Sequence, residues 1–198
     1  MVEFTRRHPE PPELTAFRAA NPQSAPKDFN SAAFHPTKLA VKRALSADQN
    51  GLCAYCESPL APDSGQIDHV KPKGGPHAHP HLTFSYDNYV HGCCDEPKHC
   101  GQKKGDGLLH LEPGPAGCNS QFDLSTNGQI DARTGLSRQE RHLVRTTRDQ
   151  LGLNFPALRL EREKWAIASL SLLQTSAADF ESFIADKPFR FILRRLVA

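Results

Sequence analysis

The sequence predicts an α+β protein in which short β elements and helices occupy separate parts of the chain. Between residues 53 and 104 the apolar runs are short and interrupted by glycine and proline, which is typical of short strands joined by turns. Farther along, FDLSTNGQI places Asn127 and Gly128 between two apolar runs, which predicts a small hairpin with a two-residue turn. The remaining C-terminal residues follow a helical pattern.

The N-terminal third predicts an arm followed by one helix. Residues 1–36 are rich in proline and have few periodic apolar positions, so an extended arm laid over the core is expected. A helix is predicted from Pro36 to Asn50, because proline suits a first helical turn and Gly51 stands just past the end.

The C-terminal part predicts further helices around the hairpin. Ser137 and Glu140 have the spacing of a capping box, and the helix that they begin is expected to run to Gly152. A second helix restarts at Pro156. The last segment, PFRFILRRLVA, predicts a short helix that buries four apolar side chains, namely Phe189, Ile192, Leu193 and Leu196.

Length and composition indicate one domain with no membrane segment. With 198 residues, a single domain over 1–198 is expected, divided into the arm 1–36, a core 37–106 and a hairpin and helical part 107–198. The 24 Lys and Arg nearly balance the 22 Asp and Glu, so bulk charge does not indicate a nucleic-acid partner. No apolar run approaches the roughly 20 residues that span a bilayer, and a cytoplasmic protein is expected.

The spacing of the cysteines indicates a structural zinc site. In a reducing compartment cysteines are metal ligands or buried thiols more often than disulfides. Cys53 and Cys56 form a C-x2-C knuckle, and a second cluster follows later in the chain. We predict one tetrahedral Zn²⁺ bound by these two together with Cys93 and Cys100, with Cys93 preferred over Cys94. The alternative, ordinary buried thiols, is less common for a knuckle followed by a second cluster.

Between the two cysteine clusters lies the sequence IDHVKPK, which contains an Asp-His pair. If this segment is a strand, Asp68 and His69 point to opposite faces, so a shared site requires a bend, a bulge or a carboxylate that reaches around. A neutral His69 can take a proton from water while Asp68 helps to bind Mg²⁺ or another divalent cation. Taken alone, the pair is more commonly a surface histidine beside a solvated aspartate, and its position between the cysteine clusters is what favours a site.

The order of the motifs resembles a known family. CAYC, IDHVKPK, a run ending in YDNY and then HCGQKKGD look like the zinc-bearing ββα-metal nucleases called HNH. Farther on, Cys118, the NGQI hairpin, RDQLGLN and Arg162 are similar to the HNH proteins of retron and Septu anti-phage systems, of the PtuB type. The resemblance covers roughly residues 1–165. It implies a zinc-stapled ββα-metal core and a metal-dependent endonuclease that cuts DNA or RNA. It also implies a PtuA-like ATPase partner and a place in a retron complex.

Carried over to this chain, the resemblance assigns three residues to catalysis. His69 would be the general base and Asp68 a ligand of the catalytic ion. Asn88 would order the loop and orient His69, which is useful because a base must present one particular ring nitrogen to water. Without the resemblance, Asn88 would be interpreted as a turn residue.

One position departs from the family pattern. A His, Asn or Asp usually follows the last zinc cysteine and supplies the second ligand of the catalytic ion, but here Gly101 follows Cys100. Gln102 is the first candidate to replace that ligand, with His99 and Asp106 as others, or Asp68, waters and phosphate hold the ion alone. The other interpretation of Gly101 is an inactive zinc-stapled module that binds nucleic acid or serves as a structural subunit.

Basic residues near the Asp-His pair are candidates for phosphate binding. We predict this role for Lys71, Lys73 and Lys104, since lysines can hold phosphates without reading sequence. Four arginines at helical spacing fit either a second phosphate-binding face or a salt-bridged surface: Arg138, Arg141, Arg145 and Arg148. The HAHPH segment is expected to be a loop rather than a metal site.

Overall fold

The computed structural model describes residues 1–94, 98–173 and 176–196 and confirms the α+β class. Its helices are α1 (Pro12–Ala20), α2 (His35–Asp48), α3 (Cys100–Lys104), α4 (Arg138–Gln150), α5 (Pro156–Leu173), α6 (Ala177–Ile184) and α7 (Arg190–Leu193). The strands are β1 (Gln66–His69), β2 (Tyr89–Gly92), β3 (Phe122–Leu124) and β4 (Ile130–Ala132). Short 3-10 helices are η1 (Pro26–Asn30), η2 (Ala32–Phe34), η3 (Pro80–Leu82), η4 (Tyr86–Asn88) and η5 (Arg194–Leu196).

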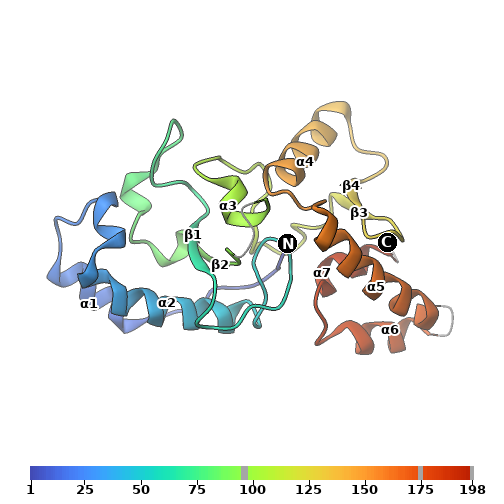
Figure 1. Cartoon of the computed structure of the whole chain (residues 1–198), viewed down its shortest axis with the longest axis horizontal. Coiled ribbons are helices and arrows are strands. Elements are labelled where there is room, and N and C mark those ends of the chain that lie inside the picture. The colour runs from blue at the N-terminus through green and yellow to red at the C-terminus, as the bar shows by residue number, and fades with distance from the viewer. Residues whose placement is uncertain (95–97, 174–175, 197–198) are drawn as a thin grey trace.

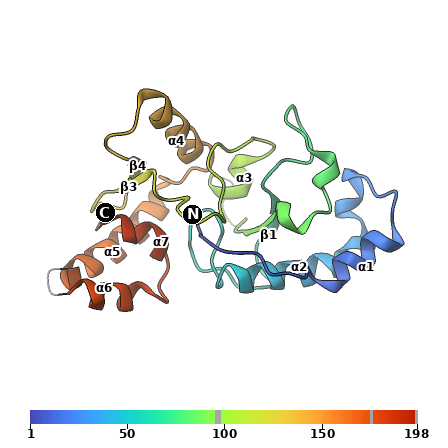
Figure 2. The same ribbon diagram turned by 180° about the vertical axis from the view of Figure 1, so that it is seen from behind.

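The two ends of the chain form different halves of the molecule. Helices α1 and α2 and the β1–β2 pair lie in one half, and α4 to α7 with the β3–β4 pair lie in the other (Figures 1 and 2). Helix α3 lies between them, close to the β1–β2 pair (Figure 1). The order of β1, β2 and α3 is that of a ββα unit.

The antiparallel pairing of β1 and β2 separates two sets of side chains. His69 pairs with Tyr89, so His69, Tyr89 and Ile67 share one face of the ribbon. On this face Ile67 and Tyr89 pack with side chains of α1 and α2. Gln66 and Asp68 project from the other face, toward α3. This register confirms the prediction that Asp68 and His69 point to opposite faces of the strand.

The expectation of an extended arm over residues 1–36 was wrong for most of that segment. Helix α1 begins at Pro12 and buries Leu14 and Phe17, three residues apart on one side of the helix. This apolar pattern lasts a single turn among prolines, too short for a periodic signal in the sequence. The helix predicted from Pro36 is confirmed as α2.

The helices predicted after the hairpin are confirmed. Ser137 and Glu140 form the predicted capping box at the start of α4, and Pro156 begins α5. Helix α6, with Ser176 as its N-cap, was not predicted as a separate element. In the final segment Phe189, Ile192 and Leu193 are buried and Leu196 is half-buried, while residues 197 and 198 lie outside the described part.

The predicted β3–β4 hairpin is confirmed, but its turn is longer than the predicted two residues. The amide of Ser125 donates to the carbonyl of Gln129 at 2.8 Å, so three residues lie between them. Gly128, the last of the three, has φ of 75°, as a three-residue turn requires at that point. The close approach of α5 leaves no room for a side chain, because a Cβ on Gly128 would lie 2.0 Å from the carbonyl oxygen of Arg159.

Replacing Gly128 with Ala is expected to destabilise the protein more than the same change at Gly135. Both glycines have positive φ, which costs an alanine about 1–2 kcal/mol, but a Cβ at Gly135 would meet nothing within 4 Å. The clash with α5 adds about 1–3 kcal/mol at Gly128 alone. Urea unfolding of both variants measures the difference. Equal losses of stability would show that the contact with α5 does not constrain the turn.

No helix in the described part of the chain is both long enough and apolar enough to cross a bilayer.

Candidate active site and zinc centre

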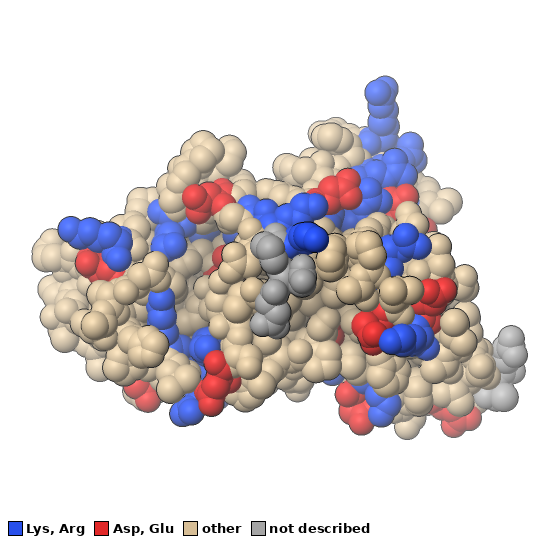
Figure 3. Space-filling view, viewed as in Figure 1, with Lys and Arg blue, Asp and Glu red and all other residues tan. Residues whose placement is uncertain are grey.

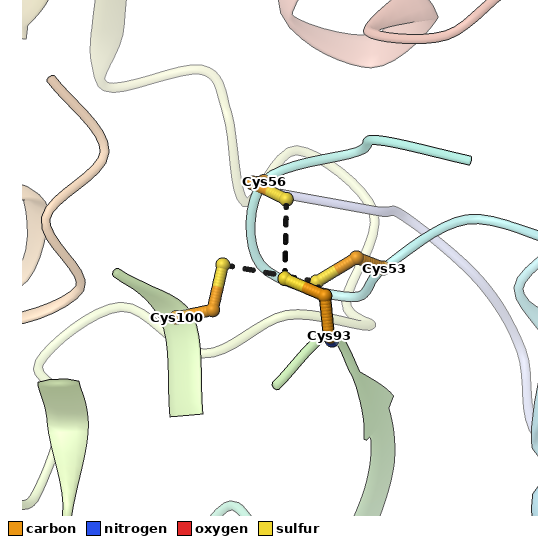
Figure 4. A group of neighbouring side chains, drawn as sticks. All are labelled: Cys53, Cys56, Cys93 and Cys100. Carbon is orange, nitrogen blue, oxygen red and sulfur yellow. Dashed lines mark hydrogen bonds between the residues drawn. The ribbon is translucent and has the colours of Figure 1, made fainter. Parts of the chain in front are cut away.

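Four buried cysteines lie close together, two from the C-x2-C knuckle and two from the ββα unit. Cys53 and Cys56 lie in the turn after α2, Cys93 follows β2, and Cys100 begins α3 (Figure 4). All four sulfur atoms lie within 4.8 Å of one another. The Sγ atoms of Cys53 and Cys100 are 3.8 Å apart, and those of Cys56 and Cys93 are 3.9 Å apart. A zinc tetrahedron with Zn–S bonds of about 2.3 Å has edges of about 3.8 Å, so this donor set fits zinc.

The ionisation of the cysteines depends on their close packing. Sulfur hydrogen bonds from Cys100 and its neighbours lower the pKa of Cys56, whereas burial raises the pKa of Cys100. A zinc ion bound between the sulfurs would favour the thiolate form of all four. The group contains Cys93 and not Cys94, as predicted.

His99 belongs to the surroundings of the cysteines. Its Nδ1 lies 3.1 Å from Sγ of Cys100, and its ring lies beside that of Phe155, tilted by 40°, with centroids 5.5 Å apart. His99 therefore points at the sulfur cluster, which removes it as a ligand for an ion at Asp68.

The ring of His69 is buried and held in one orientation. Its Nε2 lies 3.0 Å from the carbonyl oxygen of Thr83, and since a carbonyl only accepts, Nε2 carries the proton. The lone pair is then on Nδ1, the nitrogen that a general base needs. Phe29 and Tyr89 flank the ring, with centroid distances of 4.6 and 5.2 Å. Burial lowers the pKa of His69 to about 4, so the imidazole is neutral near pH 7.

Asn88 joins the two chain segments that flank His69. Its Oδ1 accepts from the backbone amide of Lys71 at 2.8 Å. Its Nδ2 donates to the carbonyl oxygens of Lys71 at 2.9 Å and Leu82 at 3.3 Å. Asn88 thus orders the loop next to Thr83, but the hydrogen bond on the His69 ring comes from Thr83. No sequence pattern indicates Thr83, because it contacts His69 only through its backbone carbonyl.

The carboxylate of Asp68 turns back along the strand. Its Oδ1 accepts from the backbone amide of His69 at 2.9 Å. Its Oδ2 accepts from the hydroxyl of Tyr55 at 2.5 Å and lies 3.5 Å from Nζ of Lys104. Burial raises the pKa of Asp68, and the Lys104 charge and the Tyr55 hydrogen bond oppose that rise. The carboxylate thus contacts the backbone of His69, while its other contacts lie on the face of β1 opposite to the His69 ring.

Two of the three lysines predicted to bind phosphate are already engaged. The side chain of Lys104 is 1% exposed, and its Nζ donates to the carbonyl of His69 at 2.8 Å, so it cannot reach a phosphate in solvent. Lys71 pairs with Glu112. The prediction for Lys104 was wrong because its spacing from Cys100 places it on the buried side of α3.

The remaining predicted lysine lies beside a residue that the sequence did not indicate. Nζ of Lys73 lies 5.4 Å from the ring centroid of Phe29, and Nζ of Lys38 lies 4.2 Å from it. Neither ammonium forms an ion pair within the described residues. Burial and then the charge of Lys73 lower the pKa of Lys38. Because Phe29 also contacts the His69 ring, these two cations lie next to the proposed base.

Gly101 faces Asp68 directly. A Cβ there would lie 3.1 Å from Asp68 Oδ2 and 2.9 Å from Nε2 of Gln66. Gln102, the predicted replacement ligand, donates to Oε1 of Gln66 at 3.1 Å rather than to Asp68. The carboxyl group of Asp106 lies against the loop at Gly75. Gln66 is therefore the polar neighbour of Asp68 that the sequence did not reveal.

Two of the four arginines on α4 are salt-bridged. Arg145 and Arg148 both bind Asp131, and Arg141 donates to the carbonyl of Leu136. Lys and Arg side chains gather over α3 and along α4 on the face shown in Figure 3, with acidic side chains among them. The histidines of HAHPH are absent from the metal-ligating group found within the described residues.

Comparison with known proteins identifies the family. No protein-family model matches the sequence. A protein of Vibrio cholerae serotype O1 biovar El Tor, named "Retron Vc95 putative HNH endonuclease", is 40% identical to this chain over 177 residues. The alignment covers 86% of each of the two chains. At this identity and coverage, with the cysteine cluster and the ββα unit in place, the chain belongs to the family of retron HNH endonucleases.

Proposed function

We propose that this protein is a metal-dependent HNH endonuclease that hydrolyses phosphodiester bonds of nucleic acid. The observation that supports it most strongly is the state of His69, whose ring is neutral near pH 7 and whose Nδ1 is free to accept a proton. A neutral histidine held by a backbone carbonyl can serve as a general base. The name of the retron relative supports the same activity.

In the proposed mechanism His69 takes a proton from the attacking water through Nδ1. The Thr83 carbonyl stabilises the imidazolium that forms, because Nε2–H donates to it throughout. Phe29 and Tyr89 keep the ring from turning. The ammonium groups of Lys38 and Lys73 lie where a phosphate next to His69 would be attracted.

Two metal sites have different roles in this proposal. Cys53, Cys56, Cys93 and Cys100 would hold Zn²⁺, which fixes α3 against the β1–β2 pair and leaves no open coordination position. Asp68 would bind Mg²⁺ or another divalent ion, which when bound supplies positive charge to the phosphate and the leaving oxygen. The support for an ion at Asp68 is its carboxylate, which already draws the Lys104 ammonium to within 3.5 Å.

Substitution of Lys38 or Lys73 by Ala is expected to weaken nucleic-acid binding uniformly across sequences. Each change should lower the slope of log affinity against log salt concentration by about 1, because each ammonium neutralises one phosphate. Binding of these variants to a labelled oligonucleotide is measured in proteins that also carry His69→Ala, and without Mg²⁺, so that the oligonucleotide is not cut. Lys164→Ala, an exposed change on α5, is the control. A slope unchanged in both variants would exclude these lysines from the substrate site.

We further propose an ATPase partner and a role in anti-phage defence within a retron system. The retron in the name of the relative supports the retron setting. The ATPase partner and the defence role rest on the resemblance of the sequence motifs to the PtuB-type proteins. Co-expression of the chain with the product of a neighbouring ATPase gene tests this association. A complex that survives size-exclusion chromatography is expected, and two proteins that elute separately in ATP and in buffer would contradict it.

An inactive zinc-stapled binding module is the second candidate function. Gly101 and the Lys104 ammonium beside Asp68 favour it, because a lysine can replace the charge of a metal ion. The two candidates predict different outcomes with plasmid DNA and RNA incubated with Mg²⁺, with and without the ATPase. A nuclease nicks or cuts one of them, and EDTA stops it. A binding module retains the nucleic acid without cutting under any of these conditions.

A further inference from the structure

The peptide groups of His69 are held by side chains rather than by the neighbouring strand. Across the β1–β2 pair, the amide of Val70 donates to the carbonyl of Asn88 at 2.9 Å. Hydrogen-bonded positions alternate along an antiparallel pair, so the amide and the carbonyl of His69 point away from β2. Their partners are Asp68 Oδ1, which accepts from the amide at 2.9 Å, and Lys104 Nζ, which donates to the carbonyl at 2.8 Å.

The two charged side chains form one cluster with a tyrosine. Nζ of Lys104 lies 3.5 Å from Oδ2 of Asp68, and the hydroxyl of Tyr55 donates to the same oxygen at 2.5 Å. Tyr55 and Lys104 are both buried. A buried charge is costly unless it is paired and hydrogen-bonded, so the ammonium is confined to the place where these partners meet it. The cluster therefore holds the backbone of His69 in one arrangement.

This cluster is connected to the cysteine site at two points. Tyr55 lies in the knuckle between Cys53 and Cys56, and Lys104 ends the helix α3 that Cys100 begins. Zinc bound by the four cysteines would fix both the knuckle and α3. It would thereby fix the positions from which the hydroxyl and the ammonium reach the Asp-His pair.

We propose that Tyr55 and Lys104 are positioning residues, which clamp the backbone of the catalytic base and so carry the order of the zinc site to it. Lys104 acts directly on the carbonyl, and Tyr55 acts through Asp68. This inference rests on the proposed role of His69 as the base. Because the Thr83 carbonyl holds the ring at Nε2, both ends of His69 are then fixed. Such precision matters, since a displacement of about 1 Å can cost about 10²-fold in rate.

The first test is the cleavage kinetics of Tyr55→Phe and Lys104→Met, which remove the polar group and keep most of the side chain. Lys104→Met should lower kcat by up to about 10²-fold, and Tyr55→Phe should lower it less because it removes one hydrogen bond. KM should stay unchanged in both, since neither side chain is exposed to substrate. Tyr86→Phe, which removes a buried hydroxyl bound to Asp48, and Lys103→Met, at the exposed neighbour of Lys104, should cleave like the wild type.

The second test observes the His69 ring and does not need cleavage. In protein labelled with ¹⁵N-histidine, the Nε2 proton that faces the Thr83 carbonyl should give a resolved NMR signal, which His69→Ala assigns by its loss. Lys104→Met should broaden that signal, because a loosened backbone lets the ring leave the carbonyl. Zinc content and thermal unfolding show whether each variant is folded.

A lower kcat with a broadened ring signal, at wild-type KM and zinc content, is the expected result. If Lys104→Met does not fold, Tyr55→Phe decides, because it keeps both buried charges. Wild-type kcat and an unchanged ring signal in the folded variants would overturn the inference and leave the proposed nuclease intact. If the wild type cuts no nucleic acid, the proposed function fails, and the ring signal alone decides whether these residues position His69.

Discussion

Substitution of Cys93 by Ser is expected to remove most of the bound zinc and to lower the thermal stability sharply, while Cys94→Ser leaves both unchanged. Sγ of Cys93 lies 3.9 Å from Sγ of Cys56 inside the buried cluster, whereas Cys94 is half-buried outside it. Structural zinc in small peptides contributes about 10–16 kcal/mol of binding free energy, comparable with the whole stability of a domain. Losing one of four thiolates therefore affects folding and not only metal content.

The zinc prediction is measured by metal analysis of the purified variants and by thermal unfolding with increasing chelator. The neighbouring positions 93 and 94 make a matched pair, because both changes replace sulfur with oxygen in adjacent residues. We expect Cys93→Ser to unfold at low chelator concentration and Cys94→Ser to behave as the wild type does. Equal zinc content in the two variants would contradict the assignment of Cys93.

His69→Ala is expected to reduce the rate of cleavage by about 10²–10⁴-fold, the usual contribution of a general base. The pH dependence is also specific. Because burial lowers the pKa of His69 to about 4, the ring stays in its basic form as the pH falls from 7.5 to 6.0. A histidine with the ordinary pKa of about 6.5 would lose about fourfold in basic form over that range.

Single-turnover cleavage between pH 7.5 and 6.0 measures this prediction. A rate that stays level in the wild type fits the buried base, and a fourfold fall would show that His69 titrates as in water.

The free energy of unfolding has a related pH dependence. Below about pH 6.5 the unfolded chain protonates at this histidine while the folded protein does not, so the stability that His69 contributes above that pH is lost as pH falls toward 4.

The sequence predicted those parts of the molecule whose residues act through their own side chains at regular spacing. The C-x2-C knuckle and the later cysteines carry zinc-ligand chemistry wherever they occur, and the structure brings Cys53, Cys56, Cys93 and Cys100 together. The alternation of a strand was enough to place Asp68 and His69 on opposite faces. The capping box of α4 could also be predicted, because it depends only on two side chains three residues apart in the sequence.

The rest of the site depends on contacts that leave no pattern in the sequence. Thr83 acts through its carbonyl oxygen, which every residue has. Lys38 reaches the neighbourhood of His69 only because α2 packs against Phe29. Gln66 is recognised as a polar neighbour of Asp68 only once Gly101 is seen beside it. The close approach of α5 to Gly128 in the β3–β4 turn is likewise a tertiary contact, which a local turn signal does not contain.

The central claim is that the His69 site cuts nucleic acid. Its most direct test measures three quantities in single preparations of wild type and His69→Ala: zinc content, affinity for an oligonucleotide, and cleavage with Mg²⁺ in the presence of the proposed ATPase partner. The account predicts equal zinc, equal affinity, and cleavage by the wild type alone. Equal cleavage by the two proteins would contradict it.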